Sequence, residues 1–165
     1  PLYLAALGPR MLRLAAGVAD GVALNWCTAD QVIWSRAEVE RAASAAARAT
    51  PEIVQYIRTA ADPDRARARK VFAGHALRYA LGPIAYRRHF ERMGFAAELQ
   101  GLRSDGGEPS PELLSAIGAW GEPGEVRAQF LRLAATLDLA IVRVLVSRPG
   151  DAESARRVLE ECRPL

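Results

Sequence analysis

The chain has 165 residues, of which half are hydrophobic, with a formal net charge of +3 and a sequence pI near 9.3. This length is enough for one domain with a sizeable core, and no apolar run approaches the roughly 20 residues that cross a bilayer. The basic residues are spread along expected helices without interleaved aromatic residues, which argues against nucleic acid as a partner.

Short apolar runs alternate with helical patterns along the chain, which predicts a parallel sheet built from βα units. Four strands are expected, at residues 2–7, 22–26, 52–60 and 139–147. A helical segment at about 77–120 interrupts the alternation. We interpret it as a helical insertion beside a ligand site.

The first 26 residues predict a strand, a tight turn, a helix and a second strand. Gly8 ends the first strand, and Pro9 begins a helix over 9–19 at the first helical position, where the missing N–H of proline costs nothing. The free amides of that first turn carry the positive end of the helix dipole. The turn therefore predicts a site for a phosphorylated ligand.

Other helix boundaries follow from capping residues. Thr28 and Gln31 have the spacing of a capping box at the start of a helix that ends near residue 49. Asp62 is expected to cap a helix that continues to about residue 81, and Gly94 to end the next one. Further helices are predicted from residue 110, over 122–135 and over 151–162.

The cysteines and histidines form no recognisable catalytic or metal-binding pattern. Cys27 and Cys162 give neither a disulfide framework nor metal-ligand spacing, which is typical of a reduced, cytoplasmic protein. Within its helix, His75 is expected to be structural. His89 is expected on a solvated helix surface, with contact to a pocket as the alternative. The sequence predicts no metal site and identifies no catalytic acid or base.

Two short sequence segments near the start of the chain carry a family resemblance. LAALGPRML at residues 4–12, followed by ADGVALNW at 19–26, resembles the luciferase-like monooxygenase superfamily, especially the branch that depends on the deazaflavin coenzyme F420. The segments 53–64, 121–125 and 142–150 continue the match in the expected order. The resemblance implies an α/β fold that is the C-terminal half of a (β/α)8 TIM barrel, with four βα units, over residues 1–165. The N-terminal half of the barrel would then be absent from this sequence.

Ligand sites in such barrels lie at the carboxyl ends of the strands. The resemblance implies that Leu7, Gly8, Arg10 and Met11 hold the phosphate-bearing tail of the coenzyme, mainly through backbone amides. It also implies that Asn25 contacts the substrate.

The ends of the second and fourth strands hold three further candidates. Trp26 either faces the coenzyme ring or the substrate, or packs at the barrel rim. Arg148 is a candidate for contact with an anionic group of substrate or coenzyme, whereas Arg143 is expected to serve packing or a salt bridge.

The resemblance implies an F420-dependent oxidoreductase that moves a hydride to or from C5 of the coenzyme and acts on a small-molecule substrate as a homodimer. An FMN-dependent monooxygenase stays open, because the same turn can hold either phosphate. A noncatalytic helical partner-binding protein, suggested by the long Arg-Ala helices, is the third hypothesis, and the four strand-like runs oppose it. Residues 1–165 alone are expected to associate without turnover.

Overall fold

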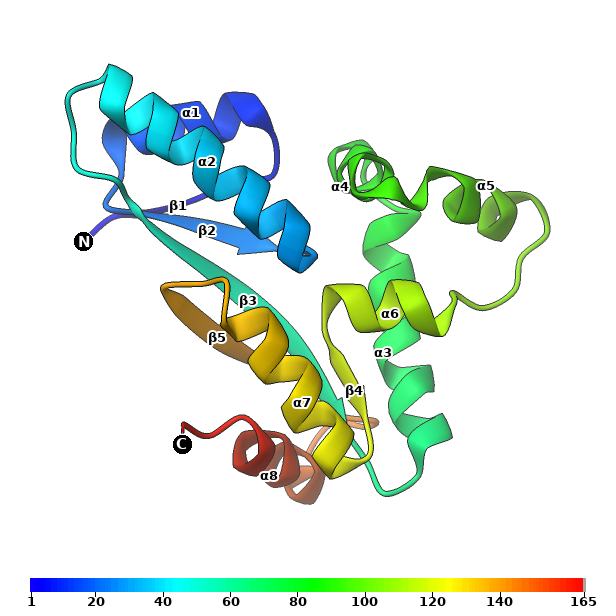
Figure 1. The fold of residues 1–165 in the computed structure, drawn as a ribbon. Helices are drawn as coiled ribbons and strands as arrows, with labels where there is room; N and C mark the ends of the chain where they lie inside the picture. Colours follow the sequence, from blue (N-terminus) through cyan, green and yellow to red (C-terminus); the bar gives the residue numbers. More distant parts are fainter. Residues whose placement is uncertain (165) are drawn as a thin grey trace.

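The computed structural model describes residues 1–164, which form a parallel five-stranded sheet with helices (Figure 1). The strands are β1 (Tyr3–Ala5), β2 (Gly21–Asn25), β3 (Glu52–Ala61), β4 (Ala119–Gly121) and β5 (Leu139–Val144). The helices are α1 (Pro9–Val18), α2 (Ala29–Ala45), α3 (Arg65–Ala80), α4 (Ile84–Phe90), the π-helix η1 (Glu91–Phe95), α5 (Ala96–Ser104), α6 (Pro111–Ile117), α7 (Pro123–Ala134) and α8 (Ala152–Glu161).

The long central strand β3 organises the sheet. β1 pairs with β2, and β2 with the first half of β3, where Asn25 lies opposite Tyr56. β5 pairs with residues 54–59 of β3, and β4 pairs with the last three residues of β3. All four predicted strands are present. This parallel sheet contradicts the third hypothesis, a helical partner-binding protein. The short β4 was not predicted, because three residues show no periodicity.

One face of the sheet is covered by helices. The other face is open over most of its area and is covered by α3 only toward the end of β3, where Ala60 clusters with Phe72. Val22, Leu24 and Ile57 point to the covered face and are fully buried, and α1, α2, α7 and α8 lie along it (Figure 1). On the opposite face, Tyr56 is 43% exposed and Leu139 is 51% exposed. This alternation follows from the period of two residues in a strand.

Helices α3 to α6 form a separate group beside the end of the sheet (Figure 1). Helices α3 to α6 pack around a buried aromatic cluster that includes Trp26, Phe72, Phe90 and Trp120. Gly94 interrupts the helix as predicted, because its backbone angles are not helical. It adopts a positive φ of 96° inside η1, and helical structure resumes in α5. Glycine adopts this conformation without steric cost, so the chain kinks there and continues.

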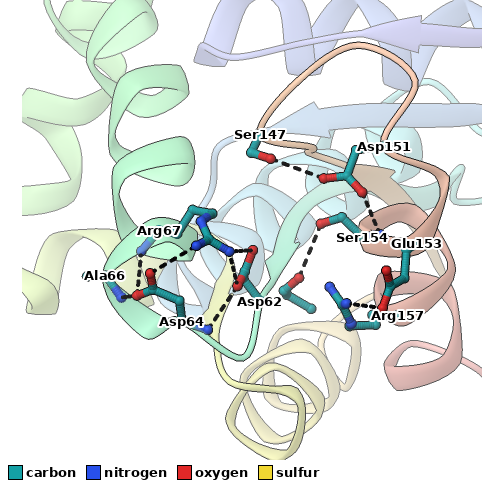
Figure 2. A network of polar contacts seen from close by, with 10 residues as sticks. Asp62, Asp64, Ala66, Arg67, Ser147, Asp151, Glu153, Ser154 and Arg157 are labelled. Carbon is teal, nitrogen blue, oxygen red and sulfur yellow. Dashed lines mark hydrogen bonds and ion pairs between the residues drawn. The ribbon is translucent and has the colours of Figure 1, made fainter.

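The helix starts near the end of β3 differ from prediction in one detail, which Figure 2 shows. Asp64, and not Asp62, caps α3 by accepting hydrogen bonds from the amides of Ala66 and Arg67. The Asp62 amide still donates to Gly121, which keeps Asp62 in the sheet. Its carboxylate accepts from the Asp64 amide at 2.8 Å and pairs with Arg67 at 3.1 Å.

The predicted capping box of α2 is half formed. Thr28 accepts a hydrogen bond from the Gln31 amide at 3.1 Å, as expected. The Gln31 side chain does not reach back, because it donates to the Ser35 hydroxyl one turn later. Within residues 1–164, no helix combines the length and the apolar character that crossing a membrane requires.

Candidate functional site

A cavity of about 460 Å³ opens at the carboxyl ends of β1 and β2, beside α4 and η1. We call it the coenzyme cavity, because it contains residues that the family resemblance assigned to the coenzyme. Four residues predicted from the sequence as ligand contacts line it: Leu7, Gly8, Met11 and Asn25. The side chains that the sequence analysis did not select are Tyr56, Tyr86, Arg88 and Arg92.

The turn at Gly8 exposes an uncapped helix start to this cavity. Gly8 is the N-cap of α1 in an extended conformation, Pro9 follows it, and no side chain caps the helix. Within residues 1–164 the first-turn amides of Arg10 and Met11 have no hydrogen-bond acceptor. A Cβ added to Gly8 would meet no atom within 4 Å. Open space and free amides at a helix N-terminus favour an anion.

The polar wall of the cavity is a fixed hydrogen-bonded chain. The Asn25 side chain donates from Nδ2 to the Tyr86 hydroxyl at 2.7 Å, and its Oδ1 accepts from Nη1 of Arg58. Arg58 also donates to the hydroxyl of Tyr79 at 3.4 Å. Because both ends of the Asn25 amide are engaged, its orientation in the cavity is set before a ligand binds.

Trp26 lies beneath this chain in the aromatic cluster and does not line the cavity. Its side chain is 1% exposed, and its ring packs against Phe72 and Tyr79 at centroid distances of 5.7 and 5.4 Å. Its φ of 57° is unusual for a bulky residue. The left-handed backbone at Trp26 occurs where the chain leaves β2, beside the polar wall.

A second chain of contacts joins α4 and η1 to the Gly8 turn. Arg92 donates to the Leu7 carbonyl at 2.6 Å and to Nδ1 of His89 at 3.3 Å. Nε2 of His89 lies 3.5 Å from the Cys27 sulfur. Because Arg92 is only a donor, Nδ1 of His89 accepts and Nε2 carries the proton.

Burial sets the protonation states in this chain. His89 is fully buried, so the prediction of a solvated helix-surface histidine was wrong. Burial and then the Arg92 charge lower the pKa of His89 to about 4. Burial raises the pKa of the Cys27 thiol to about 12, so Cys27 is not an activated nucleophile.

The remaining predicted residues lie outside the coenzyme cavity. The side chains of Arg10 and Arg148 are exposed, and β5 ends at Val144, earlier than predicted. Arg143 forms no ion pair within residues 1–164, which contradicts one of its two expected roles. The described residues include no group of three His, Cys, Asp or Glu side chains that could hold a metal ion.

The unselected residues of the cavity and of its polar wall had a weak signal in the sequence. Tyr56 and Arg58 are two residues apart in the predicted third strand, so they share one face of the sheet. Arg88 and Arg92 are four residues apart and share a helix face. Neither pair has a spacing that indicates catalysis. Only the strand register, in which Asn25 of β2 lies opposite Tyr56 of β3, brings these residues together.

Comparison with known proteins gives a family match over most of the chain. The family model described as luciferase-like monooxygenase matches residues 1–139. No curated protein matches the chain.

Solved structures share the fold at low sequence identity. A coenzyme F420-dependent tetrahydromethanopterin reductase from Methanopyrus kandleri is 20% identical with a TM-score of 0.65, over 96% of this chain and 48% of that chain. An F420-dependent secondary alcohol dehydrogenase in complex with an F420–acetone adduct is 16% identical, with a TM-score of 0.68, over 99% and 49%. For an EDTA monooxygenase from Chelativorans sp. BNC1 the identity is 12% and the TM-score 0.62, over 97% and 42%.

The chain spans about half the length of these proteins. Its parallel sheet and helices correspond to part of their TIM barrels, which confirms the predicted α/β half-barrel fold.

Proposed function

The chain belongs to the luciferase-like monooxygenase family, and from this premise we propose that its protein is an F420-dependent oxidoreductase, which transfers a hydride between the deazaflavin coenzyme and an organic substrate. The observation that carries the proposal is the uncapped start of α1 at Gly8, which opens into a cavity of about 460 Å³. Members of this family are oxidoreductases and monooxygenases, and similar structures include F420-dependent enzymes.

The charges around the cavity suit a phosphorylated coenzyme. Arg88 and Arg92 line it, and no acidic residue does so within residues 1–164. Together with the amides of Arg10 and Met11, these arginines would hold the phosphate-bearing tail. The apolar wall includes Ala5, Ala6, Ala23 and Leu24, which suits the less polar part of a bound molecule.

When bound, F420 would supply the hydride chemistry at C5. The chain's own contribution is orientation. Tyr86 accepts a hydrogen bond from Asn25, and its own O–H has no acceptor within residues 1–164. This O–H is therefore free to donate to an oxygen of the substrate in the cavity. The fixed amide of Asn25 holds the Tyr86 hydroxyl at that position.

The test is a titration of the protein produced from its complete reading frame with F420, followed by fluorescence. A Gly8→Val variant fills the open space at the turn. Valine accommodates the extended backbone of Gly8, and its Cβ meets no neighbour, so the fold should persist. The expected result is a loss of F420 affinity of about tenfold or more, because the phosphate can no longer approach the amides.

Gly17→Val is the matched control, since Gly17 lies in the same helix and a Cβ there also meets no atom within 4 Å. It should leave the affinity for F420 unchanged. If the protein binds FMN tightly instead of F420, and Gly8→Val loses that binding, the proposed site is correct but its coenzyme is FMN. Equal affinities of Gly8→Val and the unmodified protein for both coenzymes would overturn the proposal.

A further inference from the structure

A second cavity, of about 420 Å³, lies between α3 and the strands β3 and β5. Three arginines line it: Arg58 from β3, Arg78 from α3 and Arg143 from β5. We call it the arginine pocket. His75 and Tyr79 of α3 also line it, and no acidic residue does so within residues 1–164.

The three arginines have no carboxylate partners. Eight arginines elsewhere in the chain form ion pairs with Asp or Glu side chains, but Arg58, Arg78 and Arg143 form none within residues 1–164. Guanidinium groups stay charged at all physiological pH values. The pocket therefore gathers positive charges that repel one another, and an anion would relieve this repulsion.

Arg58 is held rigidly in the pocket wall. Its side chain is 8% exposed, and its Cζ lies 4.2 Å from the Trp26 ring centroid and 4.9 Å from that of Tyr79. Stacking on two aromatic rings stabilises the guanidinium in one plane. A rigid guanidinium loses little conformational entropy when an anion binds, and its geometry suits the two oxygens of a carboxylate or phosphate.

His75 supports Arg78 as a neutral acceptor. Arg78 donates from Nη2 to Nδ1 of His75 at 2.9 Å. Burial and the charges of the three arginines lower the pKa of His75 below its usual value. His75 is therefore uncharged at neutral pH and adds no competing positive charge.

The arginine pocket adjoins the coenzyme cavity through a single residue. Arg58 lines the pocket and donates to Asn25, which lines the coenzyme cavity and donates in turn to Tyr86. An anion bound at Arg58 would therefore lie one hydrogen bond away from Asn25 and two from the Tyr86 hydroxyl.

We propose that the arginine pocket binds an anionic group of the substrate, a carboxylate, sulfonate or phosphate, and so aligns the reacting part of the substrate beside Asn25 and Tyr86. This inference rests on the proposed function for its choice of substrate as the occupant. We thus assign organic anions as the substrate class of the enzyme.

The first experiment titrates inorganic phosphate into the protein produced from its complete reading frame, by calorimetry and without coenzyme. Arg78→Gln and Arg143→Gln should each weaken phosphate binding about tenfold, because each removes one charge-assisted contact. Arg103→Gln removes an equal charge from the exposed end of α5 and should change nothing. Gly8→Val identifies phosphate that binds at the coenzyme turn instead, since only that binding would be lost in it.

The second experiment titrates F420 and FMN into the same variants. Unchanged coenzyme affinity in Arg78→Gln and Arg143→Gln supports substrate as the occupant. A parallel loss of coenzyme and phosphate affinity would show that the coenzyme's own anionic groups occupy the pocket, which overturns the proposal. Phosphate binding that is equal in all four variants, or absent from the unmodified protein, also overturns it. Arginine-dependent phosphate binding without affinity for either coenzyme would keep the anion site and reject the proposed function instead.

Discussion

The guanidinium carbon of Arg58 lies 4.2 Å from the centroid of the Trp26 ring, and this stack stands at the boundary between the coenzyme cavity and the arginine pocket. The contact links two elements, because Arg58 belongs to β3 and Trp26 follows β2. Asn25, the residue before Trp26, accepts a hydrogen bond from the same guanidinium. The orientation of the Asn25 side chain and the positive charge beside it therefore both depend on the buried guanidinium of Arg58.

An Arg58→Lys substitution tests the importance of the planar group. Lysine keeps the charge but loses the stacking geometry and the forked donors. We expect unfolding in urea to show a loss of about 1 kcal/mol in stability, with weaker binding of inorganic phosphate. Arg103→Lys should change neither quantity. Full stability and full phosphate affinity in Arg58→Lys would show that only the charge matters.

Gly118→Ala is expected to destabilise the protein because the backbone packs too closely for a side chain. An added Cβ would lie 2.4 Å from Cζ of Phe72 and 2.8 Å from the carbonyl oxygen of Arg58. Relieving such overlap in a packed core costs about 1–3 kcal/mol. Urea unfolding of the purified variant measures this loss.

The matched control is Gly74→Ala in α3. No atom lies within 4 Å of a Cβ added there, so the alanine replaces a poor helix former without a clash. It should stabilise the protein by about 0.5–1 kcal/mol. The two glycine-to-alanine changes thus have opposite expected signs, and equal effects would contradict the packing described around Gly118.

The pH dependence of stability should include a contribution from His89. Its pKa falls from the usual 6.5 to about 4 in the folded chain, because the site is buried and lies beside Arg92. Between these two values the unfolded state binds more protons than the folded state, so stability falls as the pH decreases. The contribution is complete above pH 6.5 and amounts to about 3 kcal/mol.

His89→Gln separates this contribution from other titrating groups. Urea unfolding at pH 7 and pH 5 should show a smaller loss of stability for the variant than for the unmodified protein. We expect the variant to be less stable at pH 7, because it loses the packing and contacts of the buried His89, so the comparison uses the difference between the two pH values. An identical difference in both proteins would contradict the buried neutral state of His89.

Four of the five strands and the Gly8 turn were predictable, because their signals lie in neighbouring residues of the sequence. An apolar run, a glycine and a proline fix the β1–α1 turn, and the capping residue Thr28 fixes the start of α2. Asn25 was assigned from the family resemblance, in which ligand sites lie at the carboxyl ends of the strands. The turn and the helix start depend only on neighbouring residues in the sequence.

The polar wall and the burial of His89 depend on tertiary packing and had no comparable local signal. The sequence separates Asn25 from Arg58 by 33 residues and from Tyr86 by 61, and only the folded chain joins them. His89 follows two arginines, which suggested solvent exposure. In the folded chain, His89 is buried between Cys27 and Arg92, next to Phe90 of the aromatic cluster.

The last prediction concerns residues 1–165 produced alone. The open face of the sheet exposes Tyr3, Tyr56 and Leu139 by 39%, 43% and 51%, and among the described strands β1 and β5 each pair on one edge only. Apolar faces and unpaired strand edges associate with other chains. Light scattering should therefore show association that grows with concentration. Leu139→Lys should reduce it, whereas Leu159→Lys, which alters an equally exposed leucine on α8, should not. A stable monomer at all concentrations would contradict this expectation, and coenzyme turnover by that monomer would show that these residues hold a complete active site.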